Sequence, residues 1–328
     1  MDKSVITRRA VPVAVFVAVA FVACEAPTAE VATSDPGTAW VADVDAGTVY
    51  KLSRGGATIK ATAADLGEPR AVCYDPYRGY GWVADAAGGR VFRLTQRGVV
   101  EKTIYGFITP WALAYFPKEG SVWVADRGAG KVIKLGELGS VKAEVGGFND
   151  PVDVAVDAST GDVYVADAAA GVITRLDYEG RIIRKFFGYK DPQALAFNGG
   201  DGYLWVADTG NGRVVKASRN GNVVATSTAL AAPTAVTTNP STTFVYAADL
   251  EHGRVVGLDG DGALLWTNED YVEPTAVAAN SADNGVWVAD RYDFVVDKLD
   301  GATGQRYEEG SKAGFLNPAA LAVDPGTR

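Results

Sequence analysis

Acidic side chains recur directly before a series of regularly spaced prolines, and they are the groups in this chain best suited to chemistry. The residues in that position are Glu68, Thr109, Asp150, Asp191, Ala232, Glu273 and Asn317. Carboxylates held close together repel one another, so they would favour a bound cation or raised pKa values. The alternative is that these acids only flank loop prolines in solvent.

The chain offers only one histidine for catalysis or metal binding. The 328 residues contain one histidine, His252, in a glycine-containing turn after Asp249. A zinc site built on three histidines is therefore excluded, and no Ser-His-Asp set can be argued from one turn residue. We interpret His252 as a solvated turn residue, with a lone base beside Glu251 as the alternative.

The elements that must position these residues follow an internal repeat of about 41 residues. An aromatic-Val/Ala-Ala-Asp tetrapeptide begins at Trp40, Trp82, Trp123, Tyr164, Trp205, Tyr246 and Trp287. Each unit contains four short β-branched runs bounded by Gly, Asn and Asp, which is typical of strands. Seven such units predict an all-β, seven-bladed β-propeller of four-stranded antiparallel blades around a central channel.

The two ends of the repeat complement each other. Residues 318–324 form a first strand with no second strand after it, whereas Trp40 begins a second strand without a clean first strand. We expect the C-terminal strand to be the innermost strand of the N-terminal blade, which would leave no free blade edge at the seam. The competing option is an N-terminal inner strand near Pro27.

The segment Trp205–Val215 resembles the strand-turn-strand core of NHL repeats, and the resemblance covers residues 38–328. It is specific for the fold and weak for function, because one propeller scaffold serves lyases, lactonases and adaptors. The lyases that this chain resembles rely on histidines for zinc binding or proton transfer, whereas this chain has one histidine. In related propellers, the loop that enters the innermost strand lies at one mouth of the channel, where most ligand sites form.

That resemblance places the residues beside the repeated prolines at the channel mouth. The candidate ligand-binding residues are Glu68, Arg70, Trp111, Asp150, Asp191, Gln193, Glu273 and Asn317. Within this set, Asp150, Asp191 and Glu273 are the candidate metal ligands. We expect no cofactor, with calcium as the alternative.

Residue types that recur in every unit are expected to serve the fold. The tetrapeptide aromatics should fill the space between blades, and the aromatic residues three positions before the prolines should wedge the loops. The tetrapeptide aspartates should accept hydrogen bonds from N–H groups of their own turns, which have glycine four residues later. Phe294 replaces this glycine in the last full unit, which predicts an altered turn there.

The N-terminal segment predicts export. Lys3, Arg8 and Arg9 precede an apolar run over Ala10–Ala23, too short for a membrane span and typical of a signal peptide. The run ends at Cys24 in a sequence resembling a bacterial lipobox, with a cleaved or retained N-terminus as the alternative. The predicted organisation is a signal peptide over 1–24, a linker over 25–37 and a propeller over 38–328.

If Cys24 carries lipid, the second cysteine, Cys73, is unpaired, and we interpret it as a buried, inert thiol. The chain would then be anchored to the bacterial envelope, at the outer membrane in a Gram-negative cell. A periplasmic or extracellular location is the alternative.

The net charge of the chain limits the kinds of molecule that it is expected to bind. The formal net charge is −9 and no basic run follows the first ten residues, which argues against nucleic acid and against electrostatic docking on anionic lipid. We expect a monomeric, non-catalytic binding or scaffolding module for a protein, peptide or glycan at the cell surface. The alternative is a calcium-dependent, lactonase-like hydrolase that uses the mouth carboxylates.

Overall fold

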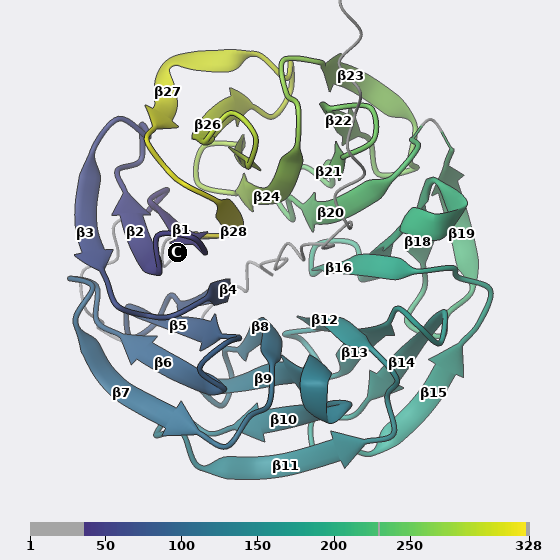
Figure 1. Ribbon diagram of the computed structural model, residues 1–328. Coiled ribbons are helices and arrows are strands. Elements are labelled where there is room, and N and C mark those ends of the chain that lie inside the picture. The colour runs from purple at the N-terminus through teal and green to yellow at the C-terminus, as the bar shows by residue number, and fades with distance from the viewer. Residues whose placement is uncertain (1–35, 229, 326–328) are drawn as a thin grey trace, which may run out of the picture.

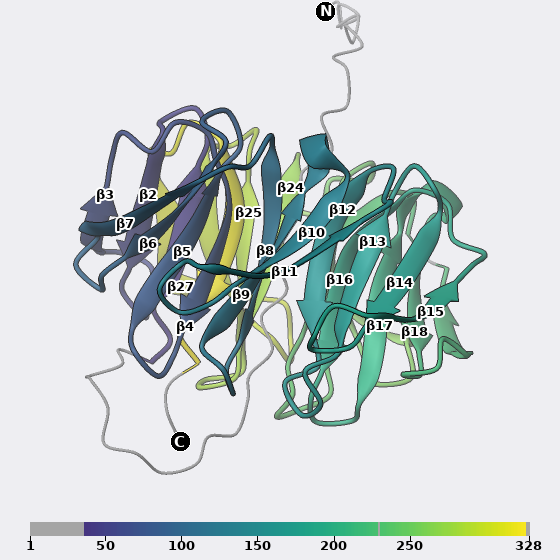
Figure 2. The same cartoon turned by 90° about the horizontal axis from the view of Figure 1, so that it is seen from below.

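The computed structural model describes residues 36–228 and 230–325, which form a ring of seven four-stranded antiparallel sheets (Figure 1). The innermost strands surround the central axis of the ring, and the outermost strands form its outer edge. Seen from the side, the outer strands β7 (Val100–Tyr105) and β11 (Val141–Gly146) lie across the direction of the inner strands, so each blade is strongly twisted (Figure 2). The predicted seven-bladed propeller is confirmed.

Three blades follow the N-terminal one in regular order, from the innermost strand to the outermost. One contains β4 (Pro69–Asp75), β5 (Tyr80–Asp85), β6 (Arg90–Leu94) and β7. The next contains β8 (Pro110–Phe116), β9 (Ser121–Asp126), β10 (Lys131–Leu135) and β11, with a 3-10 turn at Arg127–Ala129. The third contains β12 (Pro151–Val156), β13 (Val163–Asp167), β14 (Val172–Leu176) and β15 (Ile182–Phe186).

Three further blades continue the ring. One contains β16 (Pro192–Asn198), β17 (Tyr203–Asp208), β18 (Arg213–Ala217) and β19 (Val223–Ser227), with a 3-10 turn at Thr209–Asn211. The next contains β20 (Pro233–Thr238), β21 (Val245–Asp249), β22 (Arg254–Leu258) and β23 (Leu264–Asn268). The last contains β24 (Pro274–Asn280), β25 (Gly285–Asp290), β26 (Val295–Asp300) and β27 (Arg306–Ala313).

The seventh sheet joins the two ends of the propeller. Its order is β28-β1-β2-β3, made from β28 (Pro318–Val323), β1 (Ala39–Asp43), β2 (Thr48–Leu52) and β3 (Ile59–Ala63). Trp40 of β1 lies opposite Ala322 of β28 in an antiparallel register. The predicted closure is confirmed, and β28 occupies the edge of β1 that the alternative strand near Pro27 would need. Residue 27 itself lies outside the described residues.

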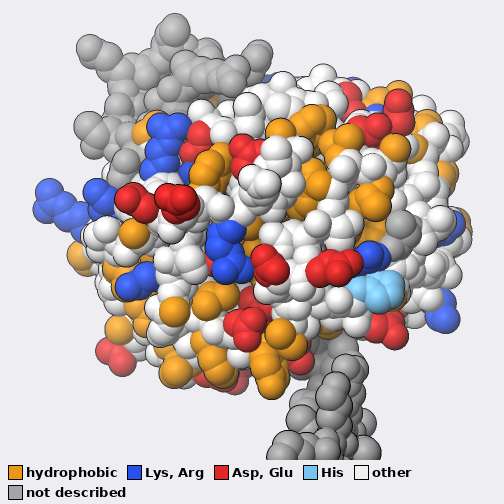
Figure 3. All heavy atoms as spheres, turned by 90° about the horizontal axis from the view of Figure 1, so that it is seen from above, with side chains coloured by type: hydrophobic (Ala, Val, Ile, Leu, Met, Phe, Trp, Pro, Cys, Tyr) orange, Lys and Arg blue, Asp and Glu red, His pale blue; other side chains and the backbone are white. Residues whose placement is uncertain are grey.

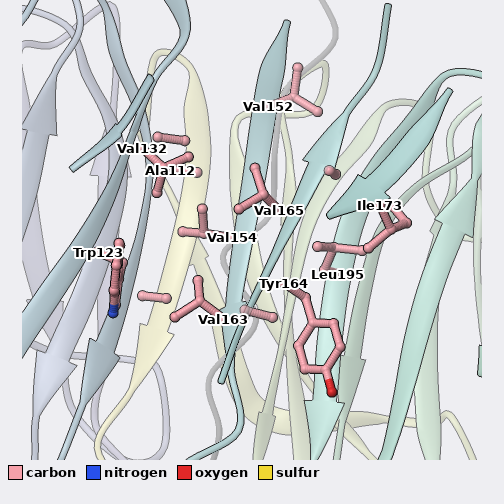
Figure 4. Packing of buried hydrophobic residues seen from close by; sticks show 14 of the residues in the cluster. Ala112, Trp123, Val132, Val152, Val154, Val163, Tyr164, Val165, Ile173 and Leu195 are labelled. Atoms are coloured by element: carbon pink, nitrogen blue, oxygen red, sulfur yellow. The ribbon is translucent and has the colours of Figure 1, made fainter. Parts of the chain in front are cut away.

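The core lies between neighbouring blades rather than within any one of them. Trp123, Val154 and Leu195 come from three successive blades and belong to one buried cluster with Tyr164 (Figure 4). The tetrapeptide aromatics are at most 1% exposed, as expected for residues that fill the wedge between sheets. Because a single blade cannot bury both faces, the ring must close to complete the core.

The turn at Phe294 keeps the left-handed φ of the glycines in the six counterpart turns, so the expected change of backbone at this position is not found. Phe294 adopts φ 58°, the same left-handed value as Gly47 and Gly89. Its carbonyl accepts a hydrogen bond from the Phe315 N–H at 3.3 Å, as the Gly89 carbonyl does from Phe107 at 3.2 Å. The surrounding strands therefore impose the turn even on a residue that disfavours it.

Within the described residues, no helix is long and apolar enough to cross a membrane. The predicted signal peptide, lipidation site Cys24 and most of the predicted linker lie outside the described residues.

Candidate channel-mouth site

A β-bulge begins the inner strand of each blade and sets the direction of the mouth side chains. In β4, β8 and β16 the pairing register shifts across the residue that follows the proline, namely Arg70, Trp111 and Gln193. A bulge takes one residue out of the regular pairing and re-aims its side chain. The candidate residues after the prolines are therefore bulge residues.

In six of the seven units, the residue before the proline donates its N–H to the buried aspartate at the end of the second strand; in the unit of Asp191, Asp208 binds the N–H of Lys190 instead. Asp167 accepts hydrogen bonds from the N–H groups of Asp150 at 3.0 Å and Asn149 at 2.9 Å. Asp126 binds the N–H of Thr109 at 2.8 Å in the same way.

These aspartates also serve their own turns, as predicted. Asp167 accepts a hydrogen bond from Ala170 N–H at 3.2 Å, and Asp85 accepts one from Gly88 N–H at 3.0 Å. The sequence interpretation missed their additional bonds to the loop 17 or 18 residues earlier. One buried carboxylate therefore joins two loops of the mouth face.

Two of the four candidate carboxylates form close pairs with arginine. Arg127 Nη2 lies 2.9 Å from Asp150 Oδ2 and bridges two blades, because Arg127 follows β9 whereas Asp150 precedes β12. Arg291 Nη2 lies 2.6 Å from Glu273 Oε2 within one blade.

The other two carboxylates have weaker or neutral partners. Arg70 Nη2 lies 3.6 Å from Glu68 Oε2. The fourth carboxylate, Asp191, accepts a hydrogen bond from the side-chain amide of Gln193. All four candidate carboxylates therefore have a donor partner at the mouth.

Trp111 joins two of these pairs into one cluster. The guanidinium carbons of Arg70 and Arg127 lie 5.0 and 4.6 Å from its ring centroid, and the residue is only 8% exposed. Cation–π contacts of this kind are stronger where water is excluded. Burial lowers the pKa of Arg70, while Glu68 and Asp45 oppose this shift and nearby Arg291 adds to it. The mouth is therefore an electrostatically coupled surface that spans several blades.

Amide groups add unsatisfied acceptors to this face. Asn317 Nδ2 donates to Asp45 Oδ1 at 3.1 Å. The buried oxygens Gln193 Oε1 and Asn317 Oδ1 have no hydrogen-bond partner among the described residues. Buried acceptors of this kind are commonly satisfied by ordered water or by a ligand.

The candidate metal ligands are not brought into one cluster. Within the described residues, no group of three or more His, Cys, Asp or Glu side chains is arranged to hold a metal ion. Asp150 and Glu273 are instead paired with arginines, and Asp191 with Gln193. The calcium hypothesis stays a prediction, and these pairs are what a cation would have to displace.

His252, Cys73 and the aromatic loop residues do not belong to the mouth cluster. His252 is half exposed, and its Nδ1 lies 2.7 Å from Asp249 Oδ2 in the same turn. Cys73 is a buried free thiol whose pKa burial raises well above its usual value. The loop residues Phe148, Tyr189, Tyr271 and Phe315 are buried, as expected for wedges.

Sequence reasoning missed Arg127, Arg291 and Asp153. The two arginines follow the repeated aspartate, a position that differs in type between units and could have been tested as the positions beside proline were. Asp153 is fully buried where the other six inner strands have alanine. It accepts hydrogen bonds from Val154 N–H at 2.8 Å and, in the next blade, from Leu195 N–H at 2.7 Å. Burial raises its pKa well above the usual value.

A cavity of about 430 Å³ lies at the opposite end of a blade from the mouth. It is lined by Glu119 and Ser121 near the start of β9 and by Gly136–Ser140 in the turn between β10 and β11, among others. This cavity contains none of the candidate residues.

Comparison with known proteins supports the repeat and the fold. The NHL repeat model matches residues 148–171, from the loop before β12 to the turn after β13. No protein of curated function matches the sequence.

Solved structures with a similar fold include two lyases and a protein of unknown function. Streptogramin B lyase aligns with a TM-score of 0.66 and 15% identity, covering 88% of this chain and 93% of the lyase. A catalytically inactive histidine-to-alanine variant of virginiamycin B lyase from Staphylococcus aureus, solved with quinupristin, gives 0.64 and 15%, covering 75% and 87%. A functionally unknown protein from Desulfotomaculum acetoxidans gives 0.75 and 12%, covering 88% and 99%. At these identities the likeness shows the fold alone.

Proposed function

Because this chain is an NHL-repeat β-propeller, we propose that it is a non-catalytic binding or scaffolding module of the bacterial cell envelope. It uses the loop face at the channel mouth to hold a protein, peptide or glycan. The chain acts as a monomer and needs no cofactor.

The pairing of the mouth carboxylates carries this proposal. Asp150 and Glu273 are held by Arg127 and Arg291. A carboxylate that acts as a base or a calcium ligand must offer its lone pairs to a substrate, water or metal. Side chains already fixed by one another instead present a preorganised polar surface, which suits recognition because little ordering cost remains on binding.

The lyase likeness does not extend to a histidine site. Replacing a histidine by alanine inactivates virginiamycin B lyase. This chain has one histidine, and His252 is engaged with Asp249 in a turn of β-propeller scaffold. Lyase chemistry of that kind is therefore a weaker proposal than binding.

The envelope location rests on the N-terminal sequence and is part of the proposal. Lys3, Arg8 and Arg9 before an apolar run indicate export, and Cys24 is the proposed lipidation site. The only other cysteine, Cys73, is buried, so the domain would rely on its core rather than on a disulfide in an oxidising compartment.

Retention on bacterial envelope fragments tests the proposal. We expect the purified protein to bind the fragments in EDTA, Trp111→Ala to lose this binding, and Leu265→Ala on the exposed outer strand β23 to keep it. Equal retention of all three proteins would contradict the proposal.

Thermal melting with and without calcium tests the hydrolase alternative. A tight site would stabilise the fold by about 2.7 kcal/mol at a hundredfold excess of ligand over the dissociation constant. We expect no calcium-dependent rise in Tm. A rise that disappears in Asp150→Asn would favour the calcium-dependent hydrolase instead.

A further inference from the structure

In its sequence, the turn between β25 and β26 departs from the six equivalent turns on the mouth face, although Phe294 keeps their left-handed φ. Four residues after the repeated aspartate, the other turns have glycine, and this one has Phe294. Tyr292 and Asp293 precede it, where most other turns have Ala, Gly or Asn. A residue that departs from an otherwise constant repeat is not explained by the needs of the fold.

Phe294 is held in an unfavourable conformation without compensation from burial. Its φ of 58° brings Cβ too close to the following carbonyl in any residue other than glycine. The side chain is nevertheless 49% exposed, so core packing does not explain why an aromatic residue stands here. Backbone strain of this kind is concentrated at functional sites.

Three other exposed apolar side chains lie beside Phe294. Asp290 accepts hydrogen bonds from Val272 N–H at 2.7 Å and Tyr292 N–H at 2.8 Å, so one carboxylate joins these two residues. The Phe294 carbonyl is bonded to Phe315 N–H, directly before Leu316.

We name Val272, Tyr292, Phe294 and Leu316 the rim patch; they are 44%, 60%, 49% and 55% exposed. Tyr271 and Phe315, the neighbours of Val272 and Leu316, are buried and anchor both loops. The two loops that carry Val272 and Leu316 are therefore held in place by buried aromatic side chains.

The rim patch has acidic surroundings. Exposed carboxylates stand at Asp45, Glu269, Asp270 and Asp293. Asp45 is joined to Asn317, the residue after Leu316, and Asp293 lies between the two rim aromatics.

The basic side chains of this sector are largely engaged or outnumbered. Arg291 pairs with Glu273, and Arg306 lies 2.9 Å from buried Asp297. Lys312 on β27 is half-buried, and the four exposed carboxylates outnumber it. The whole chain also carries a net charge of −9. On the side shown in Figure 3, hydrophobic side chains are likewise interspersed with acidic and basic ones.

We propose that the rim patch docks a basic segment of another protein, with apolar side chains placed against Tyr292 and Phe294 and lysine or arginine against the surrounding carboxylates. Exposed aromatic rings bind both apolar side chains and cations. Opposite charge at the border steers association and rejects acidic partners. This inference rests on the proposed binding function and assigns it a partner class and a sector of the mouth.

Fluorescence anisotropy with a synthetic 12-residue peptide of alternating lysine and leucine tests the inference. A peptide with glutamate in place of lysine is the charge control. We expect the lysine peptide to bind the full chain, the glutamate peptide not to bind, and the affinity to fall with salt. Phe294→Gly and Tyr292→Ala should each weaken binding about tenfold, whereas Leu265→Ala should not.

Phe294→Gly also separates function from folding defects. Removing the strained side chain should raise Tm by about 2 °C or more, so weaker binding by this variant cannot come from unfolding. A higher Tm with unchanged peptide affinity would overturn the inference, as would equal binding of the glutamate peptide.

The envelope-retention assay distinguishes the two proposals. If the lysine peptide does not bind but Trp111→Ala still abolishes retention, the rim patch is wrong and the binding function stands. If retention is equal in all variants, both fail. If an uncharged glycan competes with retention while the lysine peptide does not, the partner class is wrong.

Discussion

The indole Nε1–H of Trp266 donates a hydrogen bond of 2.9 Å to the carbonyl oxygen of Gly301 in the next blade. In other blades a cation from the third strand makes the equivalent bond: Lys134 to the Tyr178 carbonyl at 2.7 Å and Lys216 to the Gly260 carbonyl at 2.6 Å. In each of the two lysine pairs, the donor and acceptor residues are 44 positions apart. Gly257 and Gly301 have the same separation, so Gly257 stands at the position that lysine occupies in those blades. The Trp266 ring occupies the space that a side chain at Gly257 would need.

Replacing Trp266 should destabilise the fold, and a second substitution at Gly257 should restore part of the lost stability. Trp266→Ala should lower the free energy of unfolding by about 3–5 kcal/mol, because it opens a cavity and removes the bond to Gly301. Adding Gly257→Lys should recover part of the loss, since lysine makes this bond in neighbouring blades. Urea unfolding of both variants measures the effect. No recovery in the double variant would show that cation and indole are not interchangeable here.

Asp153 should make stability depend on pH with an unusual sign. Its folded-state pKa is raised by burial, whereas an unfolded aspartate has a pKa of about 3.9. The folded state therefore binds more protons above pH 4, and the stability contributed by this group is lost as the pH rises toward the folded pKa. Compared with Asp153→Ala, the wild type should lose free energy of unfolding as the pH rises above about 4. Parallel pH profiles of the two proteins would contradict this.

The seam should depend on the C-terminal strand. Truncation before Pro318 removes β28, whose Leu321 and Val323 are buried in the seam core. We expect a strongly lowered Tm and self-association, because β1 then exposes an unpaired edge. Thermal melting and light scattering measure these effects. Truncation after Gly326 is the matched control and should behave like the full chain.

The second-strand aspartates should support the mouth loops as well as their turns. Asp126→Ala removes the acceptor of the Ile108 and Thr109 N–H groups, which should cost about 1–3 kcal/mol for each group left unsatisfied. Hydrogen exchange should also accelerate at Thr109 and Trp111. Destabilisation without faster exchange in this loop would argue against the proposed role.

The number of blades, their strand order and the closing strand could all be predicted from the sequence. These features follow from a 41-residue period and from an unpaired half-unit at each end. The sequence also identified the scaffold aromatics, because all seven interfaces between blades need the same wedge. It failed at Phe294, where the missing glycine suggested a different turn and the flanking strands enforced the same one.

The chemistry of the mouth depends on side-chain contacts that could not be predicted from the sequence. Asp150 meets Arg127, Trp111 meets both Arg70 and Arg127, and Asp153 binds the Leu195 amide. Except for the contact of Trp111 with Arg127, which lies within one blade, these contacts join neighbouring blades. Repeat spacing aligns equivalent positions within units but does not report which side chains reach across to the next unit. That depends on the twist of the blades and on the bulges that aim the residues after the prolines.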